Sequence, residues 1–216
     1  MVIEGFNIIL RRLTLEDAEL VRVHRNSDEI RSYMVFRGYI SSEQQVEWFN
    51  SINNECNNYF IIESEEKKVG LIYGGLADWS KMETGNGGIF IWDQNVRNST
   101  VPLAASLLLT DISVLLGFKR TFIRIRKDNK PAIAYNIGLG YTKCDFGEDE
   151  MSWLFVLESE NYLKQSIRLK QKIFQSFQNP IEVTCEPSLY PSETFITNQF
   201  QLAYKNNPVD FNLIVI

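Results

Sequence analysis

Hydrophobic and polar residues recur along the chain with the periods of strands and helices. Large aliphatic residues over 6–13 predict a first strand. A capping-box sequence at 14–17 begins a helix that is expected to run to about residue 25. A short helix is expected over 28–35. Ser41 or Ser42 should begin another, with an apolar stripe at positions 46, 49 and 52.

The middle of the chain predicts alternating strands and helices. Strand-like runs at 59–63 and 69–79 flank a charged turn and predict a hairpin. The remaining elements follow in order: a glycine-rich turn at 85–88, a strand over 89–92, a polar loop over 93–101, an apolar helix from Pro102 to about Leu116 ended by Gly117, a strand over 121–126, a helix opened by Asp128 and Asn129 and ended by Gly138 and Gly140, and strands over 141–146 and 152–157.

The pattern changes at Glu160. One amphipathic helical face is expected to hold Tyr162, Leu163, Ile167, Leu169, Ile173, Phe174 and Phe177. Prolines beyond Pro180 predict irregular structure, followed by a strand over 211–216. The order of elements predicts a mixed α/β (α+β) sheet domain over residues 1–158 and a C-terminal extension over 159–216. An uncovered apolar face of this size predicts a role for the extension in capping the domain or in a homodimer.

Composition excludes several classes of protein. Among the 216 residues, 22 basic and 27 acidic side chains give a charge of −5, so no basic surface for nucleic acid or an anionic membrane is expected. The longest weakly charged stretch, 103–118, contains Asp111 and is too short to span a bilayer. Three cysteines without a C-x-x-C motif and a single histidine predict no metal site and no disulfide framework. A reduced, cytoplasmic protein without a signal peptide is expected.

One segment resembles the GNAT superfamily of acyl-CoA N-acyltransferases. Asn129 is followed by Lys130, Pro131 and Ala132, and Gly140-Tyr141 comes eleven positions after Asn129, as in the family pattern. Upstream residues resemble a narrower group, the enzymes that acetylate amino sugars on nucleotide carriers: His24-Arg25-Asn26, Ile30, Met34, Ile40-Ser41 and Trp48-Phe49. Together these resemblances cover about residues 6–157.

The resemblance implies a central, mostly antiparallel sheet that is splayed at the cofactor-binding strand, with acetyl-CoA as the co-substrate and no metal. A backbone N–H of the strand that includes Ile91 and Trp92 would polarise the thioester carbonyl. The residues implied at the pyrophosphate are Arg97, Asn98, Ser99, Thr100 and Val101. Asn129 would bind the backbone of the splayed strand or the pantetheine arm, although its role as a helix cap needs no ligand.

The expected pyrophosphate loop departs from the family pattern. Where the family has small residues, mostly glycine, this chain has Asn98, Thr100 and Pro102, and proline lacks an N–H donor. The loop therefore either binds CoA through fewer amides or is a helix start that has lost the ligand. In the first case, Ser99 or Thr100 would cap the helix, and their hydroxyls would replace some amide contacts.

The reaction needs a group that donates a proton to the leaving thiolate and a base that takes one from the amine, and the sequence offers several candidates for each. GNAT enzymes often carry a tyrosine seven residues after the helix-opening asparagine, and that position is Asn136 here. Tyr135 is one residue earlier, about 100° around the helix. The base could be His24, Glu83, Asp93 or a water chain.

The resemblance also implies an acceptor site. Its candidate residues are His24, Arg25, Asn26, Met34 and Trp48. The alternatives are structural: His24 and Arg25 could lie on an ordinary exposed helix end, and Trp48 could belong to the core.

The resemblance therefore implies an N-acetyltransferase that moves acetyl from acetyl-CoA to a primary amine, first of all the amine of a nucleotide-linked amino sugar. The alternatives are acetylation of a protein or another small-molecule amine, and a GNAT-fold binding module without catalysis.

Overall fold

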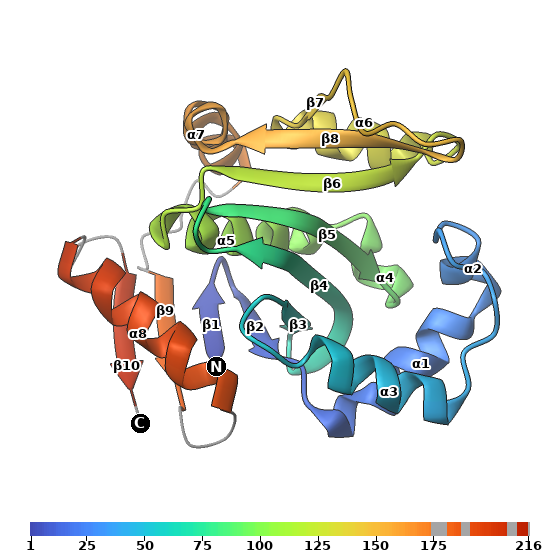
Figure 1. The fold of residues 1–216 in the computed structure, drawn as a ribbon, viewed down its shortest axis with the longest axis horizontal. Coiled ribbons are helices and arrows are strands. Elements are labelled where there is room, and N and C mark those ends of the chain that lie inside the picture. Colours follow the sequence, from blue (N-terminus) through green and yellow to red (C-terminus); the bar gives the residue numbers. More distant parts are fainter. Residues whose placement is uncertain (174–180, 187–190, 207–210, 216) are drawn as a thin grey trace.

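The computed structural model describes residues 1–173, 181–186, 191–206 and 211–215 (Figure 1). Ten strands of these described residues form one sheet in the order β10-β9-β1-β2-β3-β4-β5-β6-β8-β7. Their bounds are β1 Val2–Gly5, β2 Ile8–Arg12, β3 Asn58–Ser64, β4 Lys67–Asp78, β5 Glu83–Ile91, β6 Arg120–Arg126, β7 Thr142–Lys143, β8 Ser152–Glu158, β9 Ile181–Cys185 and β10 Phe211–Val215. Neighbouring strands are antiparallel except for the pairs β5–β6 and β9–β10. The predicted mixed α/β sheet is therefore confirmed.

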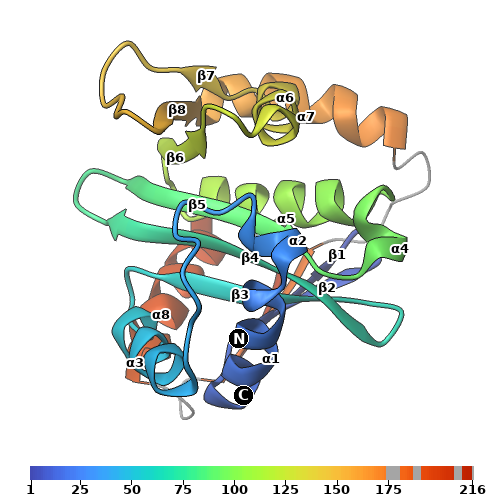
Figure 2. The same ribbon diagram turned by 90° about the vertical axis from the view of Figure 1, so that its right-hand side faces the viewer.

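Helices cover both faces of the sheet (Figure 2). They are α1 Ala18–Asn26, α2 Asp28–Arg31, α3 Ser42–Ile52, α4 Gln94–Arg97, α5 Val101–Leu115, α6 Lys130–Leu139, α7 Ser159–Ile173 and α8 Pro191–Asn206, with a 3₁₀ turn at Leu15–Asp17 before α1. The alternation of side chains along β3 explains the two layers. Phe60 and Ile62 lie in the core that includes α5 and α8, whereas Tyr59 and Ile61 pack in a second cluster with α1 and α3.

The helix ends follow the local sequence signals. The Thr14 amide and hydroxyl both donate to the Asp17 carboxylate, at 3.1 and 2.9 Å, and so confirm the predicted capping box. Ser41 caps α3 by accepting from the Gln44 amide. Gly140 ends α6 with a φ of 106°, a conformation that favours glycine. These contacts connect residues a few positions apart, which is why the sequence predicts them.

Two local predictions differ from the structure. The strand predicted over 6–13 begins only at Ile8, as β2, because Phe6 and Asn7 both have positive φ, 54° and 58°, and form a two-residue turn between β1 and β2. The glycines over 85–88 lie inside β5, where Gly87 pairs with Gly74. The turn before β5 instead begins at Asp78, whose carboxylate accepts from the amides of Ser80 and Lys81.

Two apolar faces also differ from the prediction. On α3, Gln45 and Phe49 are buried and Val46 is exposed, so the buried stripe is rotated from the predicted one. On α7, Tyr162 is fully buried, but Leu163 and Ile167 are exposed. Phe174 and Phe177 lie outside the described residues.

The chain after residue 158 contains more regular structure than predicted. The region expected to be irregular holds β9 and α8. Pro191 stands at the first position of α8, where a backbone N–H would have no acceptor within the helix, so proline is tolerated there. β9 pairs with β1 and β10 with β9, so these strands extend the central sheet. Within the described ranges, no helix is both long and apolar enough to cross a membrane.

The parallel pair β5–β6 is splayed, as the resemblance implied. Its paired residues are Glu83 with Arg120 and Thr84 with Thr121, at the beginning of both strands. Beyond Thr84 the two strands diverge toward α4 and the start of α6 (Figure 1). The divergent end of β5 leads directly into the segment 92–101.

Candidate active site

The two candidate carboxylate bases, Glu83 and Asp93, lie at opposite ends of β5. Glu83 lies at the paired end and forms an ion pair with Arg120. Ile91 is eight positions after Glu83 along β5, which places Glu83 about 26 Å from the divergent end at about 3.3 Å per residue. Asp93 accepts from the Asn95 amide at 2.9 Å and caps α4. Neither carboxylate is therefore presented as a free base at the divergent end.

The segment between β5 and α5 is an exposed turn in which several amides are used. The Ser99 hydroxyl donates to the Val96 carbonyl at 2.7 Å and accepts from the Val101 amide at 3.1 Å. Ser99 rather than Thr100 thus makes the side-chain cap of α5. Asn98, Ser99 and Thr100 are all exposed.

Two amides in this turn keep their donor capacity. The first backbone bond of α5 runs from the Ala104 amide to the Thr100 carbonyl, and Pro102 has no N–H. The amides of Thr100 and Leu103 have no acceptor among the described residues. Unpaired amides at a helix N-terminus favour an anion.

Arg97 points back into the protein. Its guanidinium forms an ion pair with Glu29 of α2 and donates to the Ile91 carbonyl at 3.0 Å. Gln94 donates to the same Glu29 carboxylate at 3.1 Å. Arg97 therefore connects α4 with α2 and with the end of β5.

The side chains of His24 in α1 and Trp92, just after β5, lie against each other. The two rings stack at 4.7 Å between centroids with an interplanar angle of 4°. The Trp92 indole N–H donates to the Lys68 carbonyl at 2.7 Å, which fixes the ring against the sheet. Burial lowers the pKa of His24 below its ordinary value, so the imidazole is neutral at pH 7.

Arg25 has an incomplete set of partners. It lies in the last turn of α1, and its Nη2 donates to the Phe36 carbonyl at 3.3 Å. Its Nη1 is buried and has no hydrogen-bond partner. Burial lowers the pKa of this guanidinium, while the Tyr73 phenol acts in the opposite direction.

Tyr73 is not among the residues that the sequence predicts for the site. Tyr59, Tyr73 and Gly88 are direct cross-strand partners on β3, β4 and β5. The two tyrosine rings stack at 4.5 Å and 6°, and a Cβ placed on Gly88 would lie 2.8 Å from the Tyr73 hydroxyl. Tyr73 therefore covers Gly88 on the divergent part of β5. The sequence gives only one signal for this arrangement: each strand of the predicted hairpin has an aromatic residue, Tyr59 and Tyr73, and a glycine follows Tyr73.

The other predicted acceptor residues have structural contacts. The Asn26 side chain donates to the Ile40 carbonyl at 2.8 Å and accepts from the Ile40 amide at 2.9 Å, so it ties α1 to the segment before α3. Trp48 packs edge to face on Tyr59 at 5.3 Å, which favours its alternative role in the core. Met34 is half-buried in the turn after α2.

The predicted site residues Tyr135, Asn136 and Asn129 form hydrogen bonds within α6 or to α5. The Tyr135 hydroxyl donates to the Pro102 carbonyl at 2.9 Å and lies 2.8 Å from the Ser106 hydroxyl, and burial raises its pKa to about 12. The Asn136 amide donates to the Ala132 carbonyl at 2.8 Å. Asn129 accepts from the Ala132 amide at 3.2 Å, which confirms its cap role.

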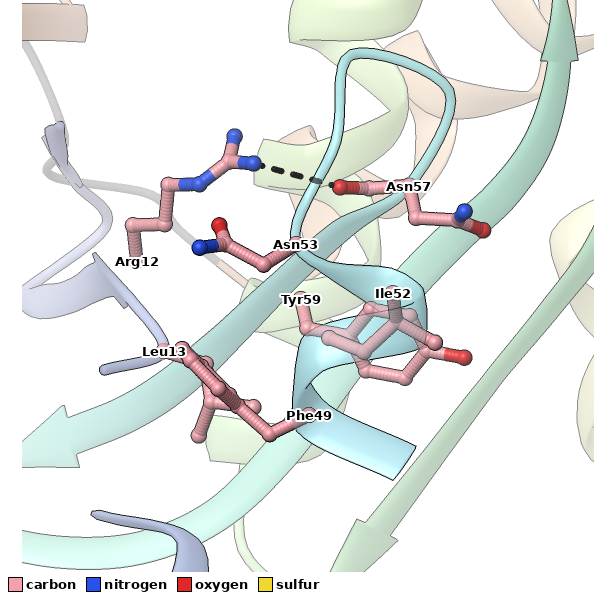
Figure 3. A pocket seen from close by; sticks show the side chains of 7 residues that line it. All are labelled: Arg12, Leu13, Phe49, Ile52, Asn53, Asn57 and Tyr59. Carbon is pink, nitrogen blue, oxygen red and sulfur yellow. Dashed lines mark hydrogen bonds between the residues drawn. The ribbon is translucent and has the colours of Figure 1, made fainter. Parts of the chain in front are cut away.

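A small hollow lies elsewhere on the molecule (Figure 3). It is lined by Arg12, Leu13, Phe49, Ile52, Asn53, Asn57 and Tyr59. Arg12 reaches into it and donates to the Asn57 carbonyl at 3.4 Å. The hollow includes no predicted site residue, so it is a packing feature between α3 and the sheet. The described residues contain no group of three or more His, Cys, Asp or Glu side chains placed to hold a metal.

Comparison with known proteins identifies the class. The family model of the acetyltransferase (GNAT) domain matches residues 7–142, more than half of the chain. The chain therefore belongs to the GNAT acetyltransferase family and is an acyltransferase. A comparison with curated proteins finds no match.

Solved structures share the fold. The nucleotide-linked sugar GNAT FdhC is 19% identical with a TM-score of 0.66, covering 80% of this chain and 98% of that one. The spermidine N-acetyltransferase of Vibrio cholerae, solved with CoA and spermine, is 17% identical with a TM-score of 0.62, covering 73% and 98%. A domain from Methanocaldococcus jannaschii is 22% identical with a TM-score of 0.61, covering 70% and 97%. At these identities the similarity establishes the fold alone.

Proposed function

We propose that the protein transfers an acetyl group from acetyl-CoA to the primary amine of a small molecule, with nucleotide-linked amino sugars as the first acceptor class to test. The main support for this proposal is that β5 diverges from β6 beside two backbone amides, those of Thr100 and Leu103, that have no acceptor among the described residues. Structures with this fold include a nucleotide-linked sugar GNAT and a spermidine N-acetyltransferase that binds CoA. The first supports the sugar acceptor, and the second supports a polyamine as the alternative small-molecule amine.

The chemistry follows from the positions of the groups. The amine nitrogen attacks the thioester carbonyl carbon, the C–S bond breaks, and the amine loses a proton while the thiolate gains one. Beyond Thr84, β5 makes no ladder pairs with β6 in the described structure, so its backbone N–H groups on that edge can stabilise the developing oxyanion.

His24 is the base that the geometry favours. Glu83 and Asp93 are engaged elsewhere, whereas no described residue hydrogen-bonds to the His24 ring nitrogens. Its lowered pKa keeps it able to accept a proton at pH 7. Tyr135 is a weaker candidate acid, because its hydroxyl already donates to Pro102.

Acetyl-CoA binding tests the donor site directly. Ligand at about 100 times its Kd should add about 2.7 kcal/mol to the free energy of unfolding, seen as a higher melting temperature. Thr100→Pro removes one free amide, and the Thr100 φ of −77° is compatible with proline. Loss of one hydrogen bond to a charged group should weaken binding about 10- to 100-fold.

Thr100→Ala is the matched control, because it removes the hydroxyl and keeps the amide. It should bind acetyl-CoA nearly as well as the wild type. The absence of a melting shift with millimolar acetyl-CoA would contradict the donor site, and equal weakening by both variants would contradict the role of the amide. Thiol release with amino-sugar nucleotides, peptides and polyamines then identifies the acceptor class.

Self-association through residues 159–216 stays a prediction. Leu163 and Ile167 of α7 are exposed, and β10 is an edge strand. Sedimentation of the wild type and a Leu163→Glu variant tests whether this face joins two copies. A cytoplasmic location likewise stays a prediction.

A further inference from the structure

Arg25 is the cation near the divergent strand for which the structure provides no counter-charge. A guanidinium has five N–H donors, and the described residues accept only one hydrogen bond from it, at the Phe36 carbonyl. Its Nη1 is shielded from solvent and has no acceptor. An unpaired buried donor on a charged group is costly, so such an arrangement is retained only where something compensates.

The protein's own carboxylates do not compensate. Every carboxylate of α1 and α2, and the one at the start of α6, is paired with another arginine: Glu19 with Arg22, Asp28 with Arg31, Glu29 with Arg97, and Asp128 with Arg126 and Arg37. No carboxylate of the described residues forms an ion pair with Arg25. The described residues therefore supply no counter-charge for Arg25.

The position of Arg25 connects it with the reaction. It acts electrostatically on Tyr73, whose hydroxyl lies over Gly88 on the divergent part of β5. His24, the adjacent residue, stacks on Trp92 at the end of the same strand. An anion bound at Arg25 would thus lie beside the strand that holds the thioester in the proposed function.

We infer that Arg25 binds an anionic group, a carboxylate or a phosphate, on the acceptor that carries the amine. This inference rests on the proposed function and specifies its substrate class. The planar guanidinium can pair with two oxygens of either anion. A polyamine acceptor is disfavoured, because its ammonium groups would place a second positive charge beside the partly buried guanidinium of Arg25.

Matched acceptors test the inference. The rate of thiol release from acetyl-CoA is measured with glucosamine 6-phosphate against glucosamine, with β-alanine against β-alaninamide, and with spermidine. The wild type should prefer at least one anionic member over its neutral partner, and the pair that shows the preference distinguishes phosphate from carboxylate. Arg25→Gln should lower kcat/KM for the preferred anionic acceptor about 10- to 100-fold, mainly through KM, and leave its neutral partner unchanged.

Arg31→Gln is the control, because Arg31 is paired with Asp28. It should change neither member of a pair. Equal use of anionic and neutral acceptors, preference for spermidine, or an equal effect of Arg25→Gln on both members would each overturn the inference.

A binding measurement covers the case in which no acceptor in the panel is used. Inorganic phosphate or acetate should raise the melting temperature of the wild type more than chloride at the same ionic strength, and Arg25→Gln should abolish the difference. Equal shifts in the two proteins would overturn the inference. A normal shift with acetyl-CoA in the same assay separates this failure from failure of the proposed function.

Discussion

Replacement of Gly88 by alanine should both destabilise the protein and impair acetyl transfer. A Cβ at this position would lie 2.8, 2.9 and 3.0 Å from the Oη, Cε1 and Cζ atoms of Tyr73. Ordinary contacts between carbon atoms are about 3.5–4.0 Å, so the ring must move by about 0.5–1 Å. Because Gly88 and Tyr73 are direct cross-strand partners, this strain acts on the divergent strand itself.

The Tyr73 ring has little room to move. It is stacked on Tyr59 at 4.5 Å, and Tyr59 in turn packs against Trp48 at 5.3 Å. Overpacking of this kind costs about 1–3 kcal/mol. We therefore expect Gly88→Ala to lower the free energy of unfolding by about 2 kcal/mol, and to lower kcat/KM as Tyr73 and β5 separate.

Gly74→Ala is the matched control on the neighbouring strand. A Cβ at Gly74 meets nothing within 4 Å. Removing a strand glycine there should leave stability unchanged or raise it by about 0.5 kcal/mol. Urea unfolding gives both free energies, and the double variant Tyr73→Leu/Gly88→Ala should recover part of the loss. Equal stability of the Gly88 and Gly74 variants, or no recovery in the double variant, would refute this reasoning.

Three further substitutions test single side chains. Arg25→Met should raise the free energy of unfolding by about 1 kcal/mol, because it removes an unpaired buried donor; lower stability in urea would instead assign the guanidinium a structural role. Tyr135→Phe should cost about 1 kcal/mol through the lost bond to Pro102 and leave kcat unchanged, whereas a fall in kcat of about 100-fold would make this hydroxyl the proton donor. Burial alone would raise the pKa of Asp17, but its hydrogen bonds from Arg11 and others hold it well below the ordinary value. Its contribution to stability should therefore be present above about pH 4 and be lost as the pH falls, and Asp17→Asn should lose about 3 kcal/mol at pH 7 and flatten the acid limb of the stability curve; an unchanged acid limb would contradict this assignment.

The elements that the sequence predicts correctly depend on local contacts. Thr14, Ser41 and Asn129 each cap a helix through an atom within three residues of them. Gly117 and Gly140 follow helices with φ values of 93° and 106°. Signals of this kind are complete within a short window of sequence.

The glycines of β5 show why the rest was not predictable. Glycine pairs are typical of turns, and 85–88 was therefore expected to be one. In the structure, these positions are strand residues whose side-chain space is occupied from elsewhere, by Tyr73 at Gly88 and by Ile123 at Gly87. The strand register that brings Tyr73 to Gly88 is not contained in either segment alone, and for this reason the sequence does not predict Tyr73 at the site.

The arginines illustrate the same limit for function. Arg97 and Arg25 both stood at positions where the resemblance implied a ligand. In the fold, Arg97 meets Glu29, which is 68 positions away, and the Ile91 carbonyl, so its charge is matched within the protein. Among the described residues, Arg25 donates a hydrogen bond only to a backbone carbonyl. Whether a cation binds a ligand or stabilises the fold is decided by which carboxylates the tertiary structure brings to it, and the unmatched charge of Arg25 is therefore the basis of the proposed anion site.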